Sequence, residues 1–420
     1  MQTIQHTAPP ARIKPSQAAL FFMLLTAFLS TMGIGIISPV LPFIVQQYLP
    51  NQDTVATVIG WLISLYAICQ FIAAPGLGAL SDRFGRRPIL LLCLFGSALG
   101  YALFGWGGAL WVLFLGRIID GLTGGNFSIL AAYVSDVTAP EERGSYFGKF
   151  GAAAGVGFIV GPVIGGFAAR WGYQAPVYVA AALTLFNMLW GYFFLAESLP
   201  AAQRNAHVGL SHLNPLTQLR GVFAIVQLRW LLLISFLYAF PFAILQSTSS
   251  VLIKDSLAWD ADGIGLVFLM LGVMDIVVQG GLVSFLLPRL GERKVALLGL
   301  VSLVLANSLY ALLPSLPSAA LLFGSVFIYG LGSGLIEPAL RGLLSQAAGA
   351  GEQGVVQGGA QSLQSLAMVI GPLVGGLLYA QVGHAAPYWL NALISGGTLV
   401  VLWLMRPSNQ PTTPTVESWG

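Results

Sequence analysis

The sequence predicts an all-α integral membrane protein with twelve transmembrane helices in two pseudo-symmetric halves of six. Three observations lead to this prediction. Of the 420 residues, 56% are hydrophobic and only 8% are charged, whereas soluble domains carry about 25% charged residues. The apolar residues come in continuous runs of roughly the 20 residues that a spanning helix needs. These runs do not alternate between polar and apolar side chains, which argues against a membrane barrel.

The predicted spans follow one another along the whole chain. In order they cover residues 18–47, 55–80, 88–107, 109–136, 145–169, 174–196, 228–253, 261–287, 293–313, 318–346, 351–379 and 386–405. The first run is too long for the apolar segment of a signal peptide, so we interpret it as a retained helix. The domain plan is a tail (1–16), a six-helix half (17–196), a polar linker (197–227), a second half (228–406) and a tail (407–420).

Basic residues gather on one side of the predicted membrane. With the N-terminus inside, the cytoplasmic segments contain Arg12, Lys14, Arg83, Arg86, Arg87, Arg143, Lys149, Arg204, Arg220, Arg229, Arg289, Arg293, Lys294 and Arg406. The other side contains only Arg170 and Lys254. This asymmetry predicts a cytoplasmic (inner) membrane protein with both termini in the cytoplasm. The charges form no stripe, so we expect no nucleic-acid partner.

The sequence carries no signature of an enzyme. Cys69 and Cys93 fall inside predicted spans and are interpreted as buried structural thiols. There is no phosphate-binding Gly-Lys-Ser/Thr loop, so ATP is not the expected energy source. The histidines lie in tails or loops without metal-ligand spacing: His6, His207, His212 and His384. We therefore expect no metal and no cofactor.

The two halves resemble each other at nearly constant spacing. Arg-Phe-Gly-Arg-Arg at 83–87 matches Arg-Leu-Gly-Glu-Arg at 289–293, an offset of 206 (289 minus 83). Gly-Pro-Val-Ile-Gly-Gly at 161–166 matches Gly-Pro-Leu-Val-Gly-Gly at 371–376, an offset of 210 (371 minus 161). Glu-Arg-Gly at 142–144 matches Glu-Gln-Gly from Glu352 at the same offset. This register indicates a duplicated unit rather than chance matching. Such halves are typical of alternating-access transporters.

The segment Gly-Ala-Leu-Ser-Asp-Arg-Phe-Gly-Arg-Arg at 78–87 is the most charged part of the chain. We expect a short loop in which the glycines permit a tight turn and close helix approach. Its aspartate can face a helix N-terminus, and its arginines can pair with carboxylates at the cytoplasmic helix ends. The resulting candidate latch is Gly78, Asp82, Arg83, Gly85, Arg86, Arg87 and Asp136. A positive-inside anchor is the alternative, but anchoring needs neither Asp82 nor the glycines.

Glycines recur along the fifth predicted span. Gly157, Gly161 and Gly165 lie on one helix face at a spacing of four, which lets two helix backbones approach closely. Pro162 removes a backbone donor and bends the helix. Together with Gly166, these residues form a Gly-Pro-x-x-Gly-Gly motif that favours a seal between the two halves over generic packing.

Four charged residues lie well inside predicted spans. Each costs roughly 2.5–3.5 kcal/mol in lipid on insertion scales, so each should face the protein interior. Arg117 and Asp120 can touch at i, i+3, and Glu337 can pair with Arg341 at i+4, whereas we expect no local partner for Asp275. Desolvation favours the neutral form of a carboxyl group, which suits a proton carrier. The proton-coupling candidates are Asp275, Asp120, Glu337 and Arg117.

Polar and aromatic side chains inside the spans are candidates for a substrate cavity. Amides in membranes cross-link helices as often as they bind ligands. The candidates are Gln70, Asn126, Gln246, Gln279, Gln361, Tyr66 and Tyr238.

Taken together, these motifs resemble the major facilitator superfamily. The 78–87 segment is similar to its best-known loop motif, and 157–166 to the fifth-helix motif of its drug/proton antiporters. Arg117-Ile118-Ile119-Asp120-Gly121 resembles the fourth-helix motif of the same group. The segments Met32-Gly33-Ile34-Gly35, Pro39-Val40-Leu41-Pro42 and 81–92 are most similar to tetracycline-resistance exporters.

The chain departs from those exporters at their acidic positions. The resemblance implies an acid just before the Met-Gly-Ile-Gly run and another in the third helix. Here these positions hold Ser30, Thr31 and Gly100, and no acid lies between Val295 and Leu313. The resemblance implies a monomeric, proton-coupled exporter of drug-like or amphipathic molecules in the lipid bilayer. A nutrient importer or facilitator on the same fold stays open, as does a non-transporting receptor, which the short tails disfavour.

Overall fold

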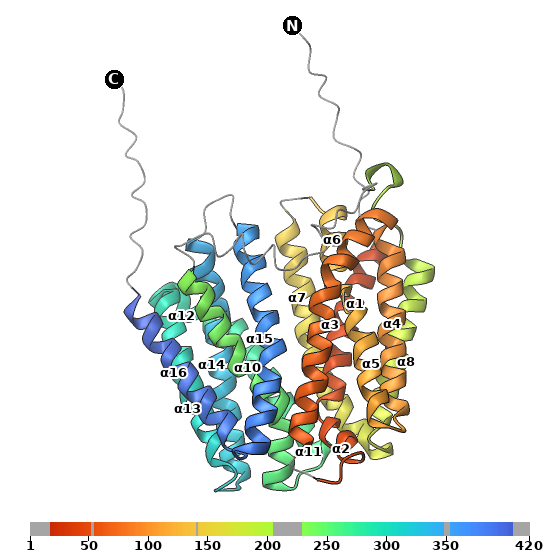
Figure 1. Cartoon of the computed structure of the whole chain (residues 1–420). Helices are drawn as coiled ribbons and strands as arrows, with labels where there is room; N and C mark the ends of the chain where they lie inside the picture. The colour runs from red at the N-terminus through yellow and green to blue at the C-terminus, as the bar shows by residue number, and fades with distance from the viewer. Residues whose placement is uncertain (1–16, 52–53, 140–141, 205–228, 348–352, 406–420) are drawn as a thin grey trace, which may run out of the picture. The chain divides into compact units, whose positions relative to one another are not determined.

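The computed structural model describes residues 17–51, 54–139, 142–204, 229–347 and 353–405. Within these ranges every regular element is helical and no strand occurs (Figure 1). Eleven of the described helices are long and apolar enough to cross a membrane. The chain is therefore a multi-pass helical membrane protein, as predicted, although these eleven helices are one fewer than the sequence predicts.

The missing span is the predicted helix over 109–136, which the structure divides into α5 (Leu110–Leu122) and α6 (Asn126–Val137). The break falls at Thr123-Gly124-Gly125. Glycine costs about 1 kcal/mol relative to alanine inside a helix, and two adjoining glycines weaken the helix at this point. The Gln70 side chain donates a hydrogen bond of 2.9 Å to the Gly124 carbonyl. Inside a membrane such a bond replaces the water that would solvate a freed backbone group.

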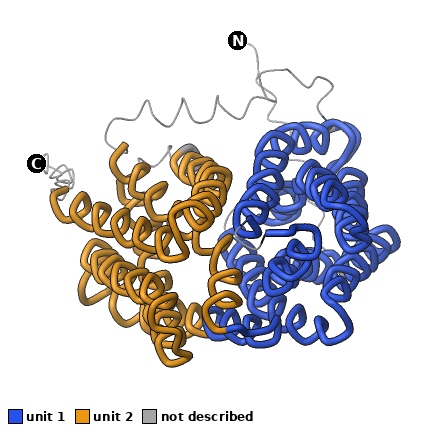
Figure 2. The backbone as a smooth tube through the Cα atoms, turned by 60° about the horizontal axis from the view of Figure 1, so that its bottom comes forward, with its two compact units in different colours: residues 1–215, 258–272 blue, residues 216–257, 273–420 orange. Residues whose placement is uncertain are grey.

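The chain forms two compact units (Figure 2). Unit 1 contains residues 1–215 and 258–272, and unit 2 contains residues 216–257 and 273–420. The sequence assigns all of the eighth predicted span to the C-terminal half, whereas its first part, 258–272, groups with unit 1. The other predicted bounds of the halves stay predictions.

Unit 1 holds the first eight α-helices of the described chain. Besides α5 and α6 they are α1 (Gln17–Ile37), α2 (Leu41–Gln46), α3 (Val55–Phe84), α4 (Arg86–Trp106), α7 (Arg143–Ala168) and α8 (Ala175–Phe194). The predicted first span therefore ends at Ile37, and a separate short helix follows Pro39, since the residue before a proline is disfavoured in helical geometry. Helix α1 packs against α7 and α8, and α4 packs against α5 and α8. The start of α11 (Ala261–Val277) completes the unit.

Unit 2 holds α10 (Arg229–Leu257) and the elements that follow residue 273. They are the end of α11, a π-helical turn (Val278–Leu282), α12 (Val283–Leu290), α13 (Glu292–Leu312), α14 (Ala319–Ala347), α15 (Gln353–Gln381) and α16 (Ala386–Leu404). Helix α13 packs against α14 and α16, and α10 packs against α15. Several sequence assignments fall outside the described residues: Arg12, Lys14, Arg220, Arg406, His6, His207, His212 and Glu352.

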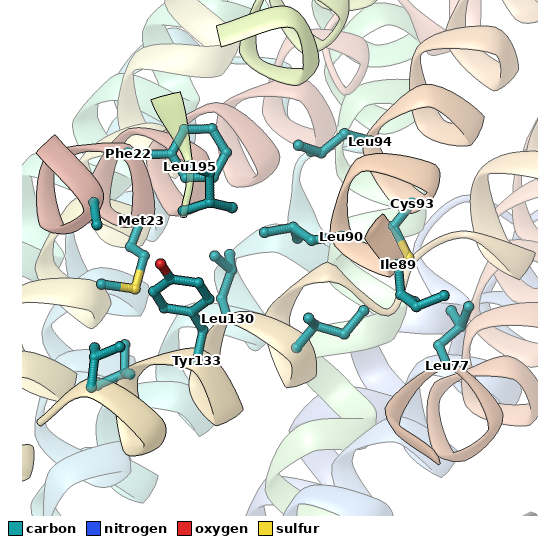
Figure 3. Packing of buried hydrophobic residues seen from close by; sticks show 14 residues of the cluster. Phe22, Met23, Leu77, Ile89, Leu90, Cys93, Leu94, Leu130, Tyr133 and Leu195 are labelled. Carbon is teal, nitrogen blue, oxygen red and sulfur yellow. The ribbon is translucent and has the colours of Figure 1, made fainter. Parts of the chain in front are cut away.

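A cluster of buried hydrophobic side chains packs α1, α3, α4 and α6 of unit 1 together (Figure 3). Phe22 comes from α1, Leu77 from α3, Leu90 and Cys93 from α4, and Tyr133 from α6. All five are less than a tenth exposed. Inside a bilayer such packing stabilises the fold through van der Waals contacts between the helices, because lipid is as apolar as the side chains themselves. Cys93 is a buried free thiol, as predicted, whereas the free thiol of Cys69 is only half-buried.

Candidate functional site

The charged segment at 78–87 is helical almost throughout, so the prediction of a loop is wrong. Helix α3 continues to Phe84 and α4 begins at Arg86, with only Gly85 between them. Gly85 has φ +107°, a left-handed conformation that favours glycine. Gly78, by contrast, has no neighbour within 4 Å of the place where a Cβ would lie, so the predicted close helix approach at this position is also wrong. A one-residue junction therefore holds the arginines rigidly at the helix ends.

Arg86 connects three elements at this junction. Its Nε donates to Asp136 of α6 at 3.1 Å, and its Nη1 donates to the Ser81 hydroxyl at 2.7 Å. The same guanidinium forms an ion pair with Asp82. The Arg86 side chain is only 10% exposed and that of Asp136 21%. The pairing with Asp136 is the one that the sequence predicts. The other two arginines bind elsewhere: Arg87 donates to the Tyr192 carbonyl, and Arg83 lies over the Phe84 ring.

Glu197 is a member of this cluster that the sequence analysis missed. Its carboxylate accepts the backbone N–H groups of Arg86 at 2.8 Å and Arg87 at 3.3 Å, the first residues of α4. A carboxylate is favourable at a helix N-terminus because the unpaired N–H groups carry partial positive charge. A Cβ on Gly85 would collide with this carboxylate, which is a second reason for glycine there. The signal in the sequence was an acid directly after the sixth span.

The glycine motif of α7 brings that helix against α1 with almost no separation. A Cβ on Gly161 would lie 2.6 Å from the Met32 carbonyl oxygen, and Cβ atoms on Gly157 and Gly165 would meet the carbonyls of Phe28 and Ile36. The Thr31 hydroxyl also donates to the Ala154 carbonyl of α7 at 2.7 Å. The predicted close approach of two helix backbones is therefore present, and its partner is α1.

A second face of α7 contacts the first part of α11, which belongs to unit 1. A Cβ on Gly166 would lie 2.7 Å from the Ala261 carbonyl oxygen, and one on Gly265 would lie 2.7 Å from the Pro162 carbonyl oxygen. Arg170, just after α7, pairs with Asp262 at 2.7 Å. The motif residues thus pack on two helices at once, which explains why both Pro162 and Gly166 belong to it.

A buried ion pair lies inside unit 1. Arg117 and Asp120 of α5 are 3.7 Å apart, and their side chains are 9% and 4% exposed. The guanidinium also lies over the rings of Phe104, at 4.9 Å, and Tyr66, at 5.9 Å. The pair that the sequence predicts is formed, but it is long. Among the described residues, Arg117 Nε and Asp120 Oδ2 have no hydrogen-bond partner.

Asp120 occupies the side of α5 that faces Gly100 of α4. A Cβ on Gly100 would lie 2.8 Å from the Asp120 Cβ and 2.7 Å from the Gly116 carbonyl oxygen. There is therefore no room for a side chain at position 100. The carboxylate at this contact between α4 and α5 is supplied by Asp120 of α5 and not by position 100 of α4.

The amide candidates of unit 1 cross-link its helices. Gln70 of α3 donates to the Tyr66 hydroxyl at 3.2 Å, besides its bond to the Gly124 carbonyl. Asn126, at the start of α6, donates to the Ser30 hydroxyl of α1 at 2.9 Å. Tyr66 lies under the Arg117 guanidinium, and Gln70 is bonded to Tyr66, so both belong to the site of the buried ion pair. Asn126 is tied to α1 instead.

The acids of unit 2 lie close to each other but differ in their partners. Asp275, near the end of α11, is hydrogen-bonded to Gln279 in the π-helical turn. Sequence analysis predicted no local partner for Asp275, and this bond corrects that. A Cβ on Gly334 of α14 would be 3.7 Å from Asp275 Oδ1, so the carboxylate lies directly against that helix. Single π-helical turns are frequent at functional sites. Among the described residues Asp275 forms no ion pair.

Glu337 is one turn from Gly334 on α14 and forms the predicted pair with Arg341, at 2.7 Å. This pair is less buried than expected, with side-chain exposures of 37% for Glu337 and 63% for Arg341. Tyr238 of α10 is 9% exposed and lies within electrostatic range of both acids. The remaining candidates are more peripheral: Gln246 is half-buried on α10, and Gln361 is exposed on α15. The cluster of Asp275, Glu337 and Arg341 therefore has one net negative charge.

The Arg117–Asp120 site of unit 1 and the Asp275–Glu337 site of unit 2 can exchange protons or hold a charged group. The described residues contain no group of side chains able to bind a metal ion. Neither site contains a nucleophile activated by a neighbouring base.

Comparison with known proteins agrees with this architecture. The chain matches the family model of the Major Facilitator Superfamily over residues 23–372 and 231–419. It is 36% identical to the tetracycline resistance protein, class D, of Salmonella ordonez, covering 96% of this chain and 99% of that protein. It is 29% identical to multidrug resistance protein 2 of Bacillus subtilis (strain 168), over 86% of this chain and 89% of that one. The crystal structure of the human organic anion transporter MFSD10 (TETRAN) superposes with a TM-score of 0.68 and 26% identity, over 93% of this chain and all of that one. The resemblance seen in the motifs is thereby confirmed, and the chain belongs to the Major Facilitator Superfamily.

Proposed function

We propose that this chain is a proton-coupled secondary exporter of drug-like or amphipathic small organic molecules. Relatives named for tetracycline and multidrug resistance align with nearly its whole length, which supports export of such compounds. The proton gradient is the driving force, and neither ATP nor a cofactor is used. The protein acts as a monomer in the cytoplasmic membrane with both termini in the cytoplasm, in accordance with the sidedness of its basic residues.

The observation that carries the proton coupling is Asp275. It lies inside a spanning helix, and no arginine or lysine of the described chain neutralises it. An uncompensated charge at this depth is costly, by roughly 2.5–3.5 kcal/mol on insertion scales. Binding a proton or a substrate removes that cost, so the two compete for one carboxylate.

The transport cycle follows from this competition. Protons from outside reach Asp275, Asp120 or Glu337, neutralise the carboxylate and weaken substrate binding. The substrate leaves, the protein turns inward, and the proton dissociates into the cytoplasm. Arg117 assists release from Asp120 because its charge is permanent. These three acids replace those that the resistance exporters carry at the positions of Ser30 or Thr31 and Gly100.

The other candidate residues position this machinery. Arg86, with Asp82 and Asp136, acts as the latch that holds one conformation, and Glu197 fixes the start of α4 beside it. The α7 glycines seal the helix contacts against ion leak. Gln70, Tyr66, Tyr238 and Gln279 provide polar contacts for the substrate, with Asn126, Gln246 and Gln361 as further candidates.

Uptake of labelled tetracycline into inverted membrane vesicles tests the proposal. Respiring vesicles with the wild-type chain should accumulate the drug, and a protonophore should abolish accumulation. A variant with Asp120→Asn, Asp275→Asn and Glu337→Gln together should accumulate none. Full accumulation by this triple variant would contradict the assignment of the acids, and accumulation that resists the protonophore would contradict proton coupling.

A further inference from the structure

Two exposed arginines occupy equivalent places in the two units, and the transport cycle above uses neither. Arg83 lies in the last turn of α3, and Arg289 lies in the last turn of α12. They are separated by the offset of 206 that relates the two helix junctions. Both side chains lie at the end of a helix long enough to cross a membrane.

Arg83 and Arg289 form no hydrogen bond and no ion pair with the described residues, and in this they differ from other arginines of the chain. Several arginines pair with a carboxylate: Arg86, Arg117, Arg170, Arg204 and Arg341. Others donate to backbone carbonyl groups: Arg87, Arg143 and Arg293. Because a guanidinium has five N–H donors and no acceptor, the two exposed arginines keep their donors free for a ligand.

Each of these arginines lies over the ring of a phenylalanine. The Arg83 guanidinium carbon is 5.2 Å from the centre of the Phe84 ring, and that of Arg289 is 3.3 Å from the centre of the Phe285 ring. The two rings are 49% and 55% exposed. Long cationic side chains extend along apolar surface and keep their charged heads in the polar layer of a membrane. Each pair therefore presents an apolar ring beside lipid and a guanidinium at the membrane boundary.

No carboxylate neutralises either arginine. Asp82, next to Arg83 in sequence, forms its ion pair with Arg86. The corresponding position before Arg289 is Pro288. Glu292, the nearest acid after it, accepts a hydrogen bond of 2.7 Å from the Gln346 side chain. Both positive charges thus stay available, on the side of the membrane that the charge asymmetry predicts to be cytoplasmic.

A general topology anchor is the alternative explanation for these charges. A cation near a helix C-terminus is favourable, and basic residues of either type fix the orientation of a membrane protein. Lysine would serve both purposes equally well. Only arginine, however, combines stacking on an aromatic ring with a planar fork of donors that fits two phosphate oxygens at once. Arginine over a ring at both equivalent places therefore favours recognition of phosphate.

We propose that Arg83 with Phe84, and Arg289 with Phe285, each bind one anionic phospholipid of the cytoplasmic leaflet. The guanidinium donates to two oxygens of the lipid phosphate, and the phenyl ring contacts the lipid chain below it. The negative potential of this leaflet attracts basic side chains near its surface. The inference does not depend on the proposed function, because it involves neither a drug nor a proton.

Counting the lipids that stay bound to the purified chain tests this proposal. The protein in detergent is titrated with phosphatidylglycerol or with phosphatidylcholine, and the complexes are measured by native mass spectrometry. We expect two binding events that favour phosphatidylglycerol. Arg83→Ala and Arg289→Ala should each weaken one of them about fivefold, as expected for one basic residue near an anionic surface, and the double variant should weaken both.

Replacing both arginines with lysine separates a specific site from general attraction. The variant with Arg83→Lys and Arg289→Lys keeps the net charge but loses the planar fork and the stacking. We expect it to bind phosphatidylglycerol more weakly than the wild type. Wild-type affinity in this variant would overturn the proposed sites, since surface charge alone would then explain the binding.

Arg170→Ala is the matched control. Arg170 also lies over an exposed ring, 5.1 Å from the centre of Phe167, but it is paired with Asp262. This variant should keep both lipids. Equal loss in Arg170→Ala, or unchanged binding in the double alanine variant, would overturn the proposal. Release of phosphatidylglycerol by an excess of inorganic phosphate would overturn the assignment to a lipid, by showing a site for the free anion.

Discussion

Arg86 shows how much a single side chain organises in this protein. It binds an aspartate on α3, across the helix junction, an aspartate on α6 and a serine hydroxyl, while it is almost fully buried. A buried charge of this kind is stabilising only when all its partners are present, because a lone buried charge is strongly unfavourable. Arg86 and its partners therefore stabilise the helix junction as one group.

Replacing Arg86 with alanine should break these contacts between α3, α4 and α6. Among the described residues, Asp136 would then accept a hydrogen bond from the Ser198 hydroxyl alone, at 2.9 Å. We expect a loss of stability of about 1–3 kcal/mol, the cost of leaving a buried acceptor unpaired, and a strong fall in drug transport. Thermal unfolding in detergent and vesicle uptake measure the two effects. Arg83→Ala is the control, since Arg83 contacts only the Phe84 ring among the described residues; equal losses in both variants would exclude a specific role for Arg86.

The two acids of unit 2 should respond differently to neutralisation. Asp275→Asn keeps the shape of the side chain and its bond to Gln279 but cannot take up a proton. We expect drug exchange to continue while pH-driven transport is lost by about a hundredfold, the range typical of a proton-transfer group. Glu337→Gln removes an ion pair that is partly exposed, for which about 0–1 kcal/mol is expected. Proton-driven transport by Asp275→Asn at the wild-type rate would refute the assignment.

The residues that could be predicted from sequence are those whose partner lies one turn away or in a known motif. Arg117 with Asp120 and Glu337 with Arg341 follow from helical spacing alone, and both pairs are formed. Glu197 could be noticed as an acid directly after the sixth span, but its partners could not be predicted, because they depend on how the end of α8 lies beside the start of α4. The bond of Asp275 to Gln279 has the i, i+4 spacing of an ordinary helix, so the sequence contained a signal for it, whereas no residue pattern indicated the π-helical turn.

The glycine motif allows helix α7 to pack closely against two other helices. Its backbone lies against the backbones of α1 and of the first part of α11, both within unit 1. Membrane helices gain stability from such close packing because lipid provides no hydrophobic force between them. The spacing of four in the sequence predicted a smooth face, although not which helices it meets.

Adding one methyl group to α7 tests this packing. Gly161→Ala would force a Cβ to within 2.6 Å of the Met32 carbonyl oxygen, so the helices must separate. Overpacking of this kind costs about 1–3 kcal/mol. Gly155→Ala is the matched control on the same helix, since nothing lies within 4 Å of its Cβ position. The midpoint temperature of thermal unfolding in detergent should therefore be lower for Gly161→Ala than for the wild type and unchanged for Gly155→Ala. A lower midpoint for Gly155→Ala with an unchanged one for Gly161→Ala would contradict the described contact of α7 with α1.

The two units repeat the same construction, which is the clearest feature of the whole molecule. Gly85 and Gly291 both have positive φ at a one-residue helix junction. Two residues further on, Arg87 donates to the carbonyl of Tyr192 at the end of α8, and Arg293 donates to those of Leu402 and Trp403 at the end of α16. A cation at a helix C-terminus is favourable in both cases. The offset of 206 in the sequence thus corresponds to a repeated contact.

For the molecule as a whole, the sequence predicted the helical membrane class and the duplicated motifs, because both depend only on local composition and spacing. It did not predict the break inside the span over 109–136, because glycines such as Gly124 and Gly125 are common in membrane helices, and the contact with Gln70 that also favours the break is a tertiary contact. Nor did it predict that 258–272 groups with unit 1, which depends on packing against α7.

The central claim is that a drug leaves in exchange for protons that bind membrane-embedded acids. The most direct measurement uses inverted vesicles with an acidic interior and a pH-sensitive dye, to which lipophilic cations, tetracyclines, phenicols and sugars are added in turn. The account predicts that a drug dissipates the gradient with the wild-type chain and leaves it intact with Asp275→Asn. A response to a sugar alone, or an equal response from both proteins, would contradict it.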